Sequence, residues 1–267
     1  MKSGAGRWLP RGKKALIGVI HLRALPGAPG ESSSLDETTA KAVEDGKAWK
    51  EGGADAVLVE NFGDAPFFAD SVPPETVAAM TAAAAEIRRA LSLPLGVNVL
   101  RNDGEAALAV AVATGADFIR VNVLTHACLT DQGVIQGTAA RLLRRRRALA
   151  SDVSILGDLF VKHGAPLVPL DPVQAAREMA ERGGADGVIV TGSATGAAAD
   201  PDLAGRLAAE CPGVDLYIGS GSTPENVPLF LPFVRGFLVG TWCEVGGRID
   251  RGRVSAMAAA IHRDHPR

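Results

Sequence analysis

The sequence predicts a single (β/α)8 barrel, and three observations support this prediction. The chain has 267 residues, a length typical of one such barrel, and 47% of them are hydrophobic, enough for a large core. Short runs rich in Val, Ile and Leu alternate with Ala-rich helical segments, as in sheets of parallel strands with crossover helices. No Pro-, Gly- or Ser-rich linker divides the chain. Residues 15–267 are therefore expected to form one domain behind a flexible, basic leader over residues 1–14.

Eight apolar runs are the expected barrel strands. Several of them follow a Gly-Ala-Asp turn, as in "GGADAVLVE" and "TGADFIRVN", which suits the return from a helix end into a buried strand. Because the runs are almost continuously apolar, both faces of the sheet are expected to be covered. A doubly wound open sheet is the alternative, but the Gly-rich first crossover typical of that fold is absent. In chain order the runs are Ala15–His21, Ala54–Glu60, Pro94–Leu100, Ala116–Val121, Val153–Val161, Ala185–Thr191, Val214–Gly219 and Val234–Gly240.

Polar side chains gather at the ends of these runs. The active site of such a barrel lies at the C-terminal ends of its strands, so ionisable groups from several strands are expected to meet there. The candidates for catalysis are His21, Glu60, Asp158, Lys162 and His163. The candidates for substrate contact are Asn61, Asp64, Asn98, Arg101, Arg120 and Asn122.

Each candidate also has a structural interpretation. A lone histidine such as His21 is often a packing or capping residue. A guanidinium within a strand, as at Arg120, needs a carboxylate or a phosphate, so a structural ion pair with Glu60 is compatible with function and an alternative to it. An amine at the end of a barrel strand, as at Lys162, can act as an electrophile, a Schiff-base former or an acid, and burial lowers its pKa.

The last three strands end in small and hydroxylated residues, which predicts an anion site. Ser222 and Glu225 stand at capping-box spacing around an early proline, so a helix is expected to begin there and to present its N-terminus to an anion. The alternative is that the glycines only turn the chain. The expected phosphate contacts are Gly219, Ser220, Gly221, Ser222, Gly240 and Thr241, and the expected donors to a sugar are Thr191, Ser193 and Thr195.

Composition argues against several classes of function. A net charge of −2 with a pI near 6.2, and an aromatic content of 4%, give no reason to expect nucleic acid as a partner. Three widely separated cysteines indicate reduced thiols in a cytoplasmic protein. No apolar run is long enough to span a membrane. A divalent metal held by His21, Glu60 and Asp158 lacks a recognisable ligand spacing, so no metal or other cofactor is expected; barrels of this type often dimerise, so a homo-oligomer is an option.

Four stretches resemble the BtpA/SgcQ family: Ile17–Gly30 "IGVIHLRALPGAPG", Asp55–Phe67 "DAVLVENFGDAPF", Val161–Gly164 "VKHG" and Val190–Gly196 "VTGSATG". The similarity runs from about Lys14 to the last helix. It implies a TIM barrel related to the phosphate-binding barrels. The family is named for photosystem I accumulation in cyanobacteria and for a sugar-utilisation gene cluster, and a nucleosidase-like activity has been suggested for it. The site residues that the resemblance carries over are His21, Glu60, Asn61, Asp64, Lys162 and His163.

One departure from the family concerns the stretch "VGTWCEVGG". Family members tend to carry a lysine near Glu244, so the charge beside the expected anion site is reversed here.

Two functions from different classes remain open. In the first, an enzyme binds a small phosphorylated sugar or ribosyl compound, and Lys162, His163 and Glu60 perform acid/base chemistry as an isomerase, a lyase or a nucleosidase-like hydrolase. In the second, a non-enzymatic assembly factor of the photosystem I type contacts membrane complexes through its outer helices, including the run Arg144–Arg147. That run is otherwise a solvated helix face with one arginine pairing locally. A barrel that binds a regulatory metabolite lies between the two.

Overall fold

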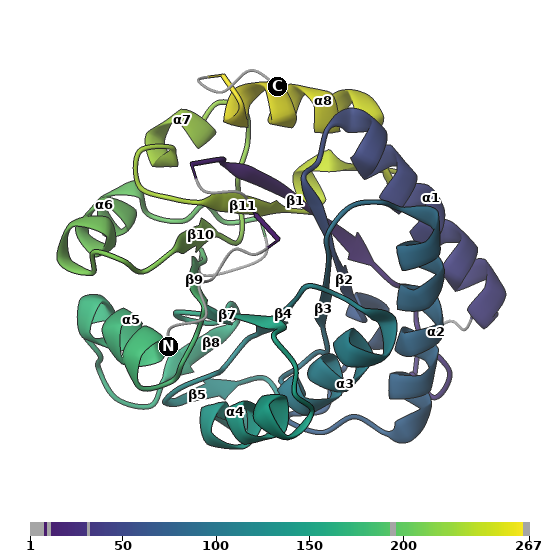
Figure 1. Cartoon of the computed structure of the whole chain (residues 1–267), viewed down its shortest axis with the longest axis horizontal. Coiled ribbons are helices and arrows are strands. Elements are labelled where there is room, and N and C mark those ends of the chain that lie inside the picture. Colours follow the sequence, from purple (N-terminus) through teal and green to yellow (C-terminus); the bar gives the residue numbers. More distant parts are fainter. Residues whose placement is uncertain (1–7, 10–11, 31–32, 193–195, 264–267) are drawn as a thin grey trace.

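The computed structural model describes residues 8–9, 12–30, 33–192 and 196–263. Within these residues eight parallel strands close into a barrel that helices surround, which confirms the predicted fold (Figure 1). The strands lie in the order β1-β11-β10-β9-β7-β4-β3-β2, and pairing of β1 with β2 completes the ring. They are β1 (Ala15–His21), β2 (Ala56–Glu60), β3 (Leu95–Asn98), β4 (Phe118–Val121), β7 (Ser154–Asp158), β9 (Gly187–Val190), β10 (Leu216–Ile218) and β11 (Gly236–Val239).

Each barrel strand lies within the apolar run that predicted it, and β1 coincides with its run. The fifth run needs a correction. It was expected to extend as a strand to Val161, but β7 ends at Asp158. Lys162 and His163 therefore lie in a turn beyond the strand rather than at its end.

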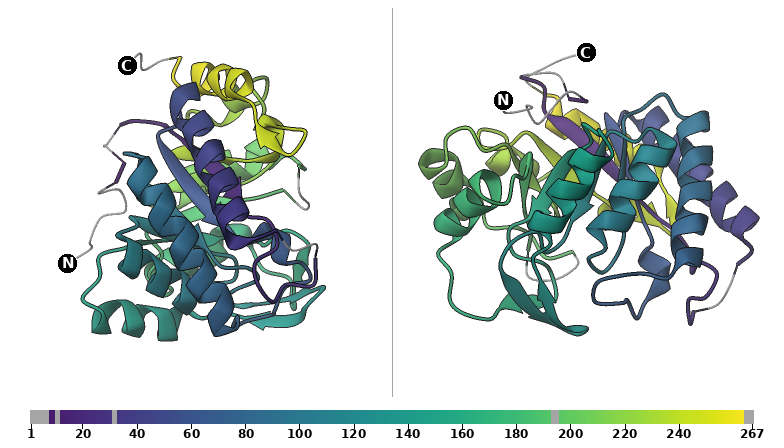
Figure 2. Two further views of the ribbon diagram at one scale, coloured as in Figure 1. Left: turned by 90° about the vertical axis from the view of Figure 1, so that its right-hand side faces the viewer. Right: turned by 60° about the horizontal axis from the view of Figure 1, so that its bottom comes forward.

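The helices form an outer ring around the barrel, as Figures 1 and 2 show. Five of those in the described chain begin after an Asp or Ser whose side chain accepts a hydrogen bond from a first-turn amide, which satisfies an otherwise unpaired donor. The capped helices are α1 (Leu35–Gly52), α3 (Gly104–Thr114), α5 (Pro172–Glu181), α6 (Pro201–Glu210) and α8 (Arg251–Ile261), and the others are α2 (Pro74–Ala90), α4 (Ala139–Ala148) and α7 (Val227–Phe230).

The Gly-Ala-Asp turns have a specific structural task. Asp55 accepts a hydrogen bond from the Leu16 amide at 2.8 Å, so the start of β2 is tied to the neighbouring β1. Asp117 and Asp186 repeat this arrangement between β4 and β3 and between β9 and β7, at 2.9 Å each. The repeated Asp thus sets the register of adjacent strands at the N-terminal end of the barrel.

The apolar core has two parts. The barrel interior holds inward-facing side chains such as Phe118 and Tyr217, while a larger layer fills the space between the barrel and the helices. Trp49 of α1 packs directly on β1, where a Cβ at Gly18 would lie 2.1 Å from its ring. Glycine at this position is what lets the helix approach the strand.

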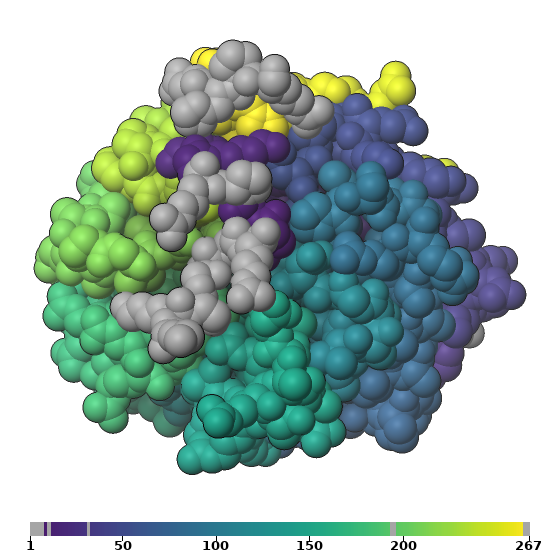
Figure 3. Space-filling model, viewed as in Figure 1, coloured from purple at the N-terminus to yellow at the C-terminus, as the bar shows by residue number. Residues whose placement is uncertain are grey.

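The N-terminal end of the barrel is covered by residues from the segment expected to be a flexible leader. Trp8 stacks on Phe118 with ring centroids 4.5 Å apart, and Leu9 is only 1% exposed. Lys13 pairs with Asp55 at 2.6 Å, and Lys14 donates to the Val234 carbonyl at 2.6 Å. Figure 3 shows this face, with the described N-terminal residues in purple near its centre.

Small sheets and 3-10 turns, which were not predicted from the sequence, lie at the C-terminal end of the barrel. Strand β5 pairs antiparallel with β6 and with β8, and β12 pairs with β13. Together with two 3-10 turns, these elements are β5 (Ala127–Thr130), β6 (Gly133–Gln136), β8 (Gly164–Pro166), β12 (Glu244–Val245), β13 (Arg248–Ile249), η1 (Phe62–Asp64) and η2 (Thr241–Cys243).

The arginine run lies on α4, as expected. Arg146 pairs with Asp186 at 2.7 Å, while Arg144, Arg145 and Arg147 are exposed. No helix in the described ranges is both long and apolar enough to cross a membrane.

Candidate active site

A cavity of about 390 Å³ opens at the C-terminal ends of the barrel strands. This volume lies within the range of small-molecule sites in proteins. The structure brings most of the predicted site residues together around it. Those that line the cavity are His21, Glu60, Arg101, Arg120, Asn122, Lys162, His163, Gly219, Ser220, Gly221, Ser222, Gly240 and Thr241.

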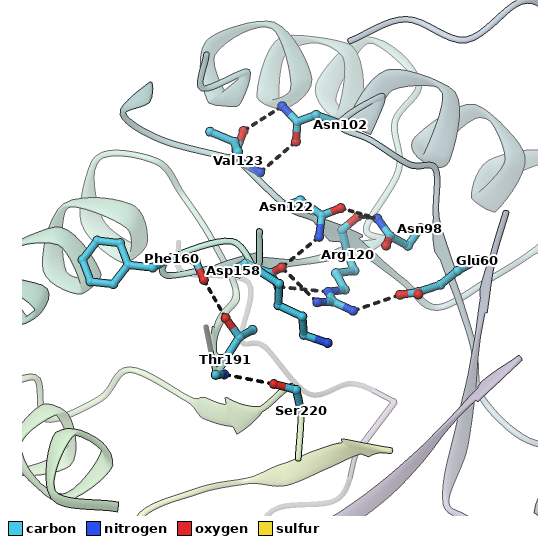
Figure 4. A network of polar contacts seen from close by, with 12 residues as sticks. Glu60, Asn98, Asn102, Arg120, Asn122, Val123, Asp158, Phe160, Thr191 and Ser220 are labelled. Carbon is cyan, nitrogen blue, oxygen red and sulfur yellow. Dashed lines mark hydrogen bonds and ion pairs between the residues drawn. The ribbon is translucent and has the colours of Figure 1, made fainter. Parts of the chain in front are cut away.

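Arg120 lies at the centre of a buried polar network (Figure 4). Its Nη1 donates to Glu60 Oε1 at 2.9 Å, and its Nε and Nη2 donate to the two carboxylate oxygens of Asp158, each at 2.9 Å. Asn122 donates to Asp158 as well, at 2.8 Å. Burial disfavours the charge of Arg120, but Asp158 and Glu60 outweigh this effect and raise its pKa. The ion pair expected between strands is present, and it is shared with a second carboxylate.

Lys162 reaches the cavity from the turn after β7. Burial lowers its pKa from 10.5 to about 8; Arg120 and Arg101 lower it too, while Glu60 and Asp158 oppose them. At pH 7 about a tenth of the amine is therefore neutral. Within the described part of the chain, its Nζ has no hydrogen-bond or ion-pair partner. The amine is available to a ligand.

Arg101 supplies a further buried cation. Its side chain is 8% exposed and lines the cavity, and its Nη2 donates to the backbone carbonyl of Lys162. Its Nε is buried and has no hydrogen-bond partner among the described residues. Burial lowers the pKa of Arg101, but a guanidinium keeps its proton at neutral pH.

The charges around the cavity favour an anion. Three buried or partly buried cations, Arg101, Arg120 and Lys162, face two buried carboxylates, Glu60 and Asp158. Arg120 engages both carboxylates but offsets only one of their charges, so the five groups carry a formal sum of +1 when Lys162 is protonated. A ligand with one negative charge would neutralise this sum.

Backbone with small side chains, at Gly219–Ser222 and Gly240–Thr241, forms one side of the cavity. Gly221 has a φ of +62°, and a Cβ there would lie 2.4 Å from backbone atoms of Ala197. Ser222 is 4% exposed, and its Oγ is buried without a hydrogen-bond partner among the described residues. Buried hydroxyls in proteins are normally paired, so this hydroxyl is a position where a ligand acceptor fits.

The expected helix after this edge needs a correction. Ser222 does not cap a helix, because α7 begins only at Val227 and spans a single turn. The side chain of Asn226 instead closes a turn there, accepting from the Thr223 amide at 2.9 Å and donating to the Gly221 carbonyl at 2.8 Å. The predicted anion contacts at this edge therefore lack the helix N-terminus that the sequence suggested.

Ser220 and His21 contact the backbone that forms this side of the cavity. Ser220 Oγ accepts from the Gly192 amide at 2.9 Å and donates to the Ala197 carbonyl at 3.1 Å, so it joins the loops after β9 and β10. A Cβ at Gly240 would lie 3.1 Å from the His21 ring. His21 Nδ1 is 3.5 Å from Glu244, and this contact holds the pKa of Glu244 below its usual value.

Several predicted residues do not line this cavity. Asn61 and Asp64 bond to each other at 2.9 Å and border a neighbouring cavity of about 190 Å³. Asp158 and Asn98 are buried in the network around Arg120, with Asn98 donating to the Arg120 carbonyl at 3.0 Å. Thr191 donates to the Phe160 carbonyl at 2.6 Å, while Ser193 and Thr195 lie outside the described residues.

A metal site at His21, Glu60 and Asp158 finds no support in the geometry. Glu60 and Asp158 both bind Arg120, and His21 contacts Glu244 instead. The described residues contain no group of three or more His, Cys, Asp or Glu side chains placed to hold a metal ion.

Almost the whole chain matches one known protein family. The model of the BtpA family matches residues 12–263. The chain belongs to the BtpA family. An uncharacterised protein of Pyrococcus horikoshii is 45% identical over 88% of this chain and 89% of its own length. The photosystem I biogenesis protein BtpA of Synechocystis is 41% identical, over 92% of this chain and 87% of its own.

Solved structures support the fold of this BtpA-family chain. The thiamine phosphate pyrophosphorylase of Pyrococcus furiosus superposes with a TM-score of 0.60 at 14% identity, covering 95% of this chain and 98% of its own. The N-(5'-phosphoribosyl)anthranilate isomerase of the same organism gives a TM-score of 0.57 at 14% identity, covering 93% and 99%. At such low identity the likeness concerns the barrel alone.

All four stretches that carried the resemblance to the BtpA family contribute to the cavity. Their lining residues include His21, Glu60, Phe62, Phe67, Lys162, His163 and Gly196.

An apolar wall of the cavity was missed by sequence reasoning. The rings of Phe62 and His21 are tilted by 34° with their centroids 4.6 Å apart, and the ring centroids of Phe62 and Phe67 are 6.4 Å apart. Leu100 and Trp242 also line the cavity, as do Val19, Thr223, Leu238 and Val239. Phe62 and Trp242 come shortly after the ends of β2 and β11, so their positions at strand ends were a signal for them in the sequence, whereas Phe67 lies farther on, beyond η1.

Proposed function

We propose that this BtpA-family barrel is an enzyme that binds a small phosphorylated sugar or ribosyl compound in the 390 Å³ cavity and transforms it by acid/base chemistry. One observation supports this most directly: an unpartnered amine at Lys162, whose pKa is lowered to about 8, shares a cavity with a hydroxyl at Ser222 that is buried and unpartnered among the described residues. The amine of Lys162 can transfer protons near neutral pH, and the hydroxyl of Ser222 can donate a hydrogen bond to a ligand oxygen.

The phosphate would bind at the edge formed by Gly219–Ser222 and Gly240–Thr241. The tight backbone at Gly221 keeps side chains away, so a phosphate oxygen can reach the amides and the Ser222 hydroxyl. Positive charge at Arg101 and Lys162 compensates the phosphate across the cavity.

The proton transfers would involve Lys162, His163 and Glu60. Neutral Lys162 accepts a proton from the substrate, and His163, which also lines the cavity, can return one. Glu60 holds Arg120 through one oxygen, and its other oxygen accepts no hydrogen bond from the described residues. An isomerase, a lyase and a nucleosidase-like hydrolase all use such a set.

Ligand binding tests the proposal. Thermal denaturation of the purified chain is followed with ribose 5-phosphate, nucleoside monophosphates and inorganic phosphate, each organic phosphate against its unphosphorylated counterpart. The phosphorylated compounds are expected to raise the melting temperature, because a ligand that binds only the folded state stabilises it. Ser222→Ala should weaken this effect, and Lys162→Met should abolish turnover, whereas Lys47→Met on the exposed face of α1 should change neither. Stabilisation that is the same with and without the phosphate would contradict the proposal.

A second candidate, an assembly factor, is favoured by the name of the Synechocystis relative and by the exposed arginines of α4. It predicts binding to vesicles with anionic lipid in a flotation assay, lost when Arg144, Arg145 and Arg147 become serine. Arg146 is left in place because it pairs with Asp186. The matched control changes Arg206, Arg248 and Arg251, which are exposed on other elements. If the chain does not bind the vesicles, the assembly-factor proposal is rejected and the enzyme proposal is kept.

A further inference from the structure

The surroundings of Lys162 differ from those of the other charges in the cavity. Arg120 is held by two carboxylates, and Arg101 donates to a backbone carbonyl. Lys162 Nζ has no partner in the described chain, although burial and the two guanidinium groups disfavour its charge. An ammonium in such a place is costly unless a ligand pairs with it, whereas a neutral amine needs only weak partners.

A neutral amine within a cavity is a nucleophile for carbonyl carbon. The nearby apolar wall, which includes Phe62, Leu100 and Val19, limits water around the amine and so favours a condensation that releases water. The carboxylate of Glu60, which lines the same cavity, has an oxygen that no described residue occupies. It can carry the proton that the carbinolamine oxygen needs before it leaves.

We propose that Lys162 forms a covalent imine with the carbonyl group of an open-chain phosphorylated aldehyde or ketone. This deepens the proposed function, on which it rests, because the phosphate would be held at Gly221 and Ser222 while the carbonyl meets the amine. Once the imine has formed, Glu60 and His163 carry the protons in place of Lys162. The ammonium first gives its extra proton to Glu60. The Nζ lone pair then forms a bond to the carbonyl carbon, the π electrons of the carbonyl bond move to oxygen, and a proton passes from the nitrogen to that oxygen. Glu60 returns its proton to the same oxygen, which leaves as water while the restored nitrogen lone pair completes the carbon–nitrogen double bond.

The balance of this step needs no oxidant or reductant. The protonated amine of Lys162 and one molecule of the carbonyl compound give one protonated imine and one water. The product keeps one positive charge, which Glu60 faces across the cavity. The cationic imine withdraws electrons from the substrate carbon, so a neighbouring bond from carbon to hydrogen or to carbon is weakened for the acid/base chemistry that follows.

Reductive trapping tests the proposal on the full chain. The protein is incubated separately with glyceraldehyde 3-phosphate, dihydroxyacetone phosphate and ribose 5-phosphate, with and without sodium borohydride, and its intact mass is measured. At least one probe should give a borohydride-dependent gain equal to the mass of the carbonyl compound less one oxygen atom. Peptide mapping should place that gain on Lys162.

Matched variants make the result specific. Lys162→Met should lose the adduct, whereas Lys47→Met should keep it. Glycerol 3-phosphate, which has no carbonyl group, should compete with trapping, and Ser222→Ala should reduce trapping of phosphorylated probes more than that of glyceraldehyde. Absence of an adduct with all three probes, or an adduct spread over surface lysines, overturns the imine.

The thermal measurements separate this inference from the function on which it rests. Stabilisation by phosphorylated compounds without a trapped adduct would remove only the imine. If neither stabilisation nor an adduct is seen, both proposals fall.

Discussion

At the scale of single residues, the cavity is organised by Arg120. This guanidinium engages Glu60 and Asp158 with three hydrogen bonds of 2.9 Å, and all three residues are at most 5% exposed. Such a buried triad contributes less to stability than to position, because desolvation of the charges offsets much of their attraction. Its role here is to engage both carboxylates, so that neither forms a direct ion pair with Lys162, although both still act on its charge across the cavity.

Arg120→Met should destabilise the fold by about 3–5 kcal/mol, because Glu60 and Asp158 would remain buried without a cation. Urea denaturation measures the change. Arg141→Met is the control: it breaks an exposed pair with Glu105 at 3.4 Å and should alter stability by no more than about 0.5 kcal/mol. An equally small loss at Arg120 would contradict the buried triad.

The lowered pKa of Lys162 predicts a pH dependence of anion binding. Sulfate is a suitable probe, because its own charge is constant between about pH 6 and 10. Below pH 8 the amine is protonated and attracts the anion; as pH rises through about 8 the charge is lost, so sulfate affinity should fall. Calorimetric titration across this range measures it, and Lys162→Met should remove the dependence. An affinity that declines only near pH 10.5 would mean that the amine is not buried as described.

The same group affects stability in the opposite direction. Its pKa is lower in the folded than in the unfolded chain, so between about pH 8 and 10.5 the unfolded state binds more protons. Stability from this group therefore increases with pH across that window. Relative to Lys162→Met, the unfolding free energy of the parent chain should therefore increase between about pH 7 and 10.

At the scale of elements, the repeated Gly-Ala-Asp turns align neighbouring strands. Each Asp accepts from the amide of an adjacent strand and also meets a cation, such as Arg146 at Asp186 or Arg88 at Asp117. This arrangement lies at the end of the barrel far from the cavity. It is therefore expected to act on stability and not on ligand binding.

Asp186→Ala should lower stability by about 1–3 kcal/mol, because the Ile155 amide loses its acceptor and Arg146 loses its carboxylate partner. Thermal unfolding measures the loss, and Glu181→Ala, on an exposed position of α5, serves as control. Sulfate affinity of the folded protein should stay unchanged. A comparable loss in both variants would argue against the strand-aligning role.

At the scale of the whole molecule, the barrel is closed at one end and open at the other. Leu9 and Trp8 cover the N-terminal end, and the cavity occupies the C-terminal end. Leu9→Ala should cost about 2–5 kcal/mol, as for other fully buried leucines, and leave sulfate binding intact. Denaturant unfolding and calorimetry on the same sample check both parts, and loss of binding by the folded variant would contradict the separation of the two ends.

The order of the barrel strands could be predicted because each strand carries a strong local signal. An apolar run such as Gly187–Val190, preceded by Gly-Ala-Asp, leaves few alternatives to a buried parallel strand. The charged residues that line the cavity could be located for the same reason, since a carboxylate like Glu60 stands out at the end of such a run.

Other features leave no local signal. The strand β8 has only three residues and no apolar face. The apolar run that contains β7 continues through Leu159 and Val161, so nothing in the sequence marks the turn at Lys162. At the predicted helix start, Asn226 instead forms local hydrogen bonds to the Thr223 amide and the Gly221 carbonyl, and these close a turn where the capping-box spacing predicted a helix.

The Arg120 network joins residues that lie far apart in the chain, and this has a practical consequence. Glu60, Arg101 and Arg120 precede the exposed turn at Asp131 between β5 and β6, whereas Lys162 and Ser222 follow it. A break at that turn would divide the protein into two pieces, each with half of the cavity. If ligand binding is seen only after the two pieces are mixed, then binding can be used to measure how well the fragments reassemble.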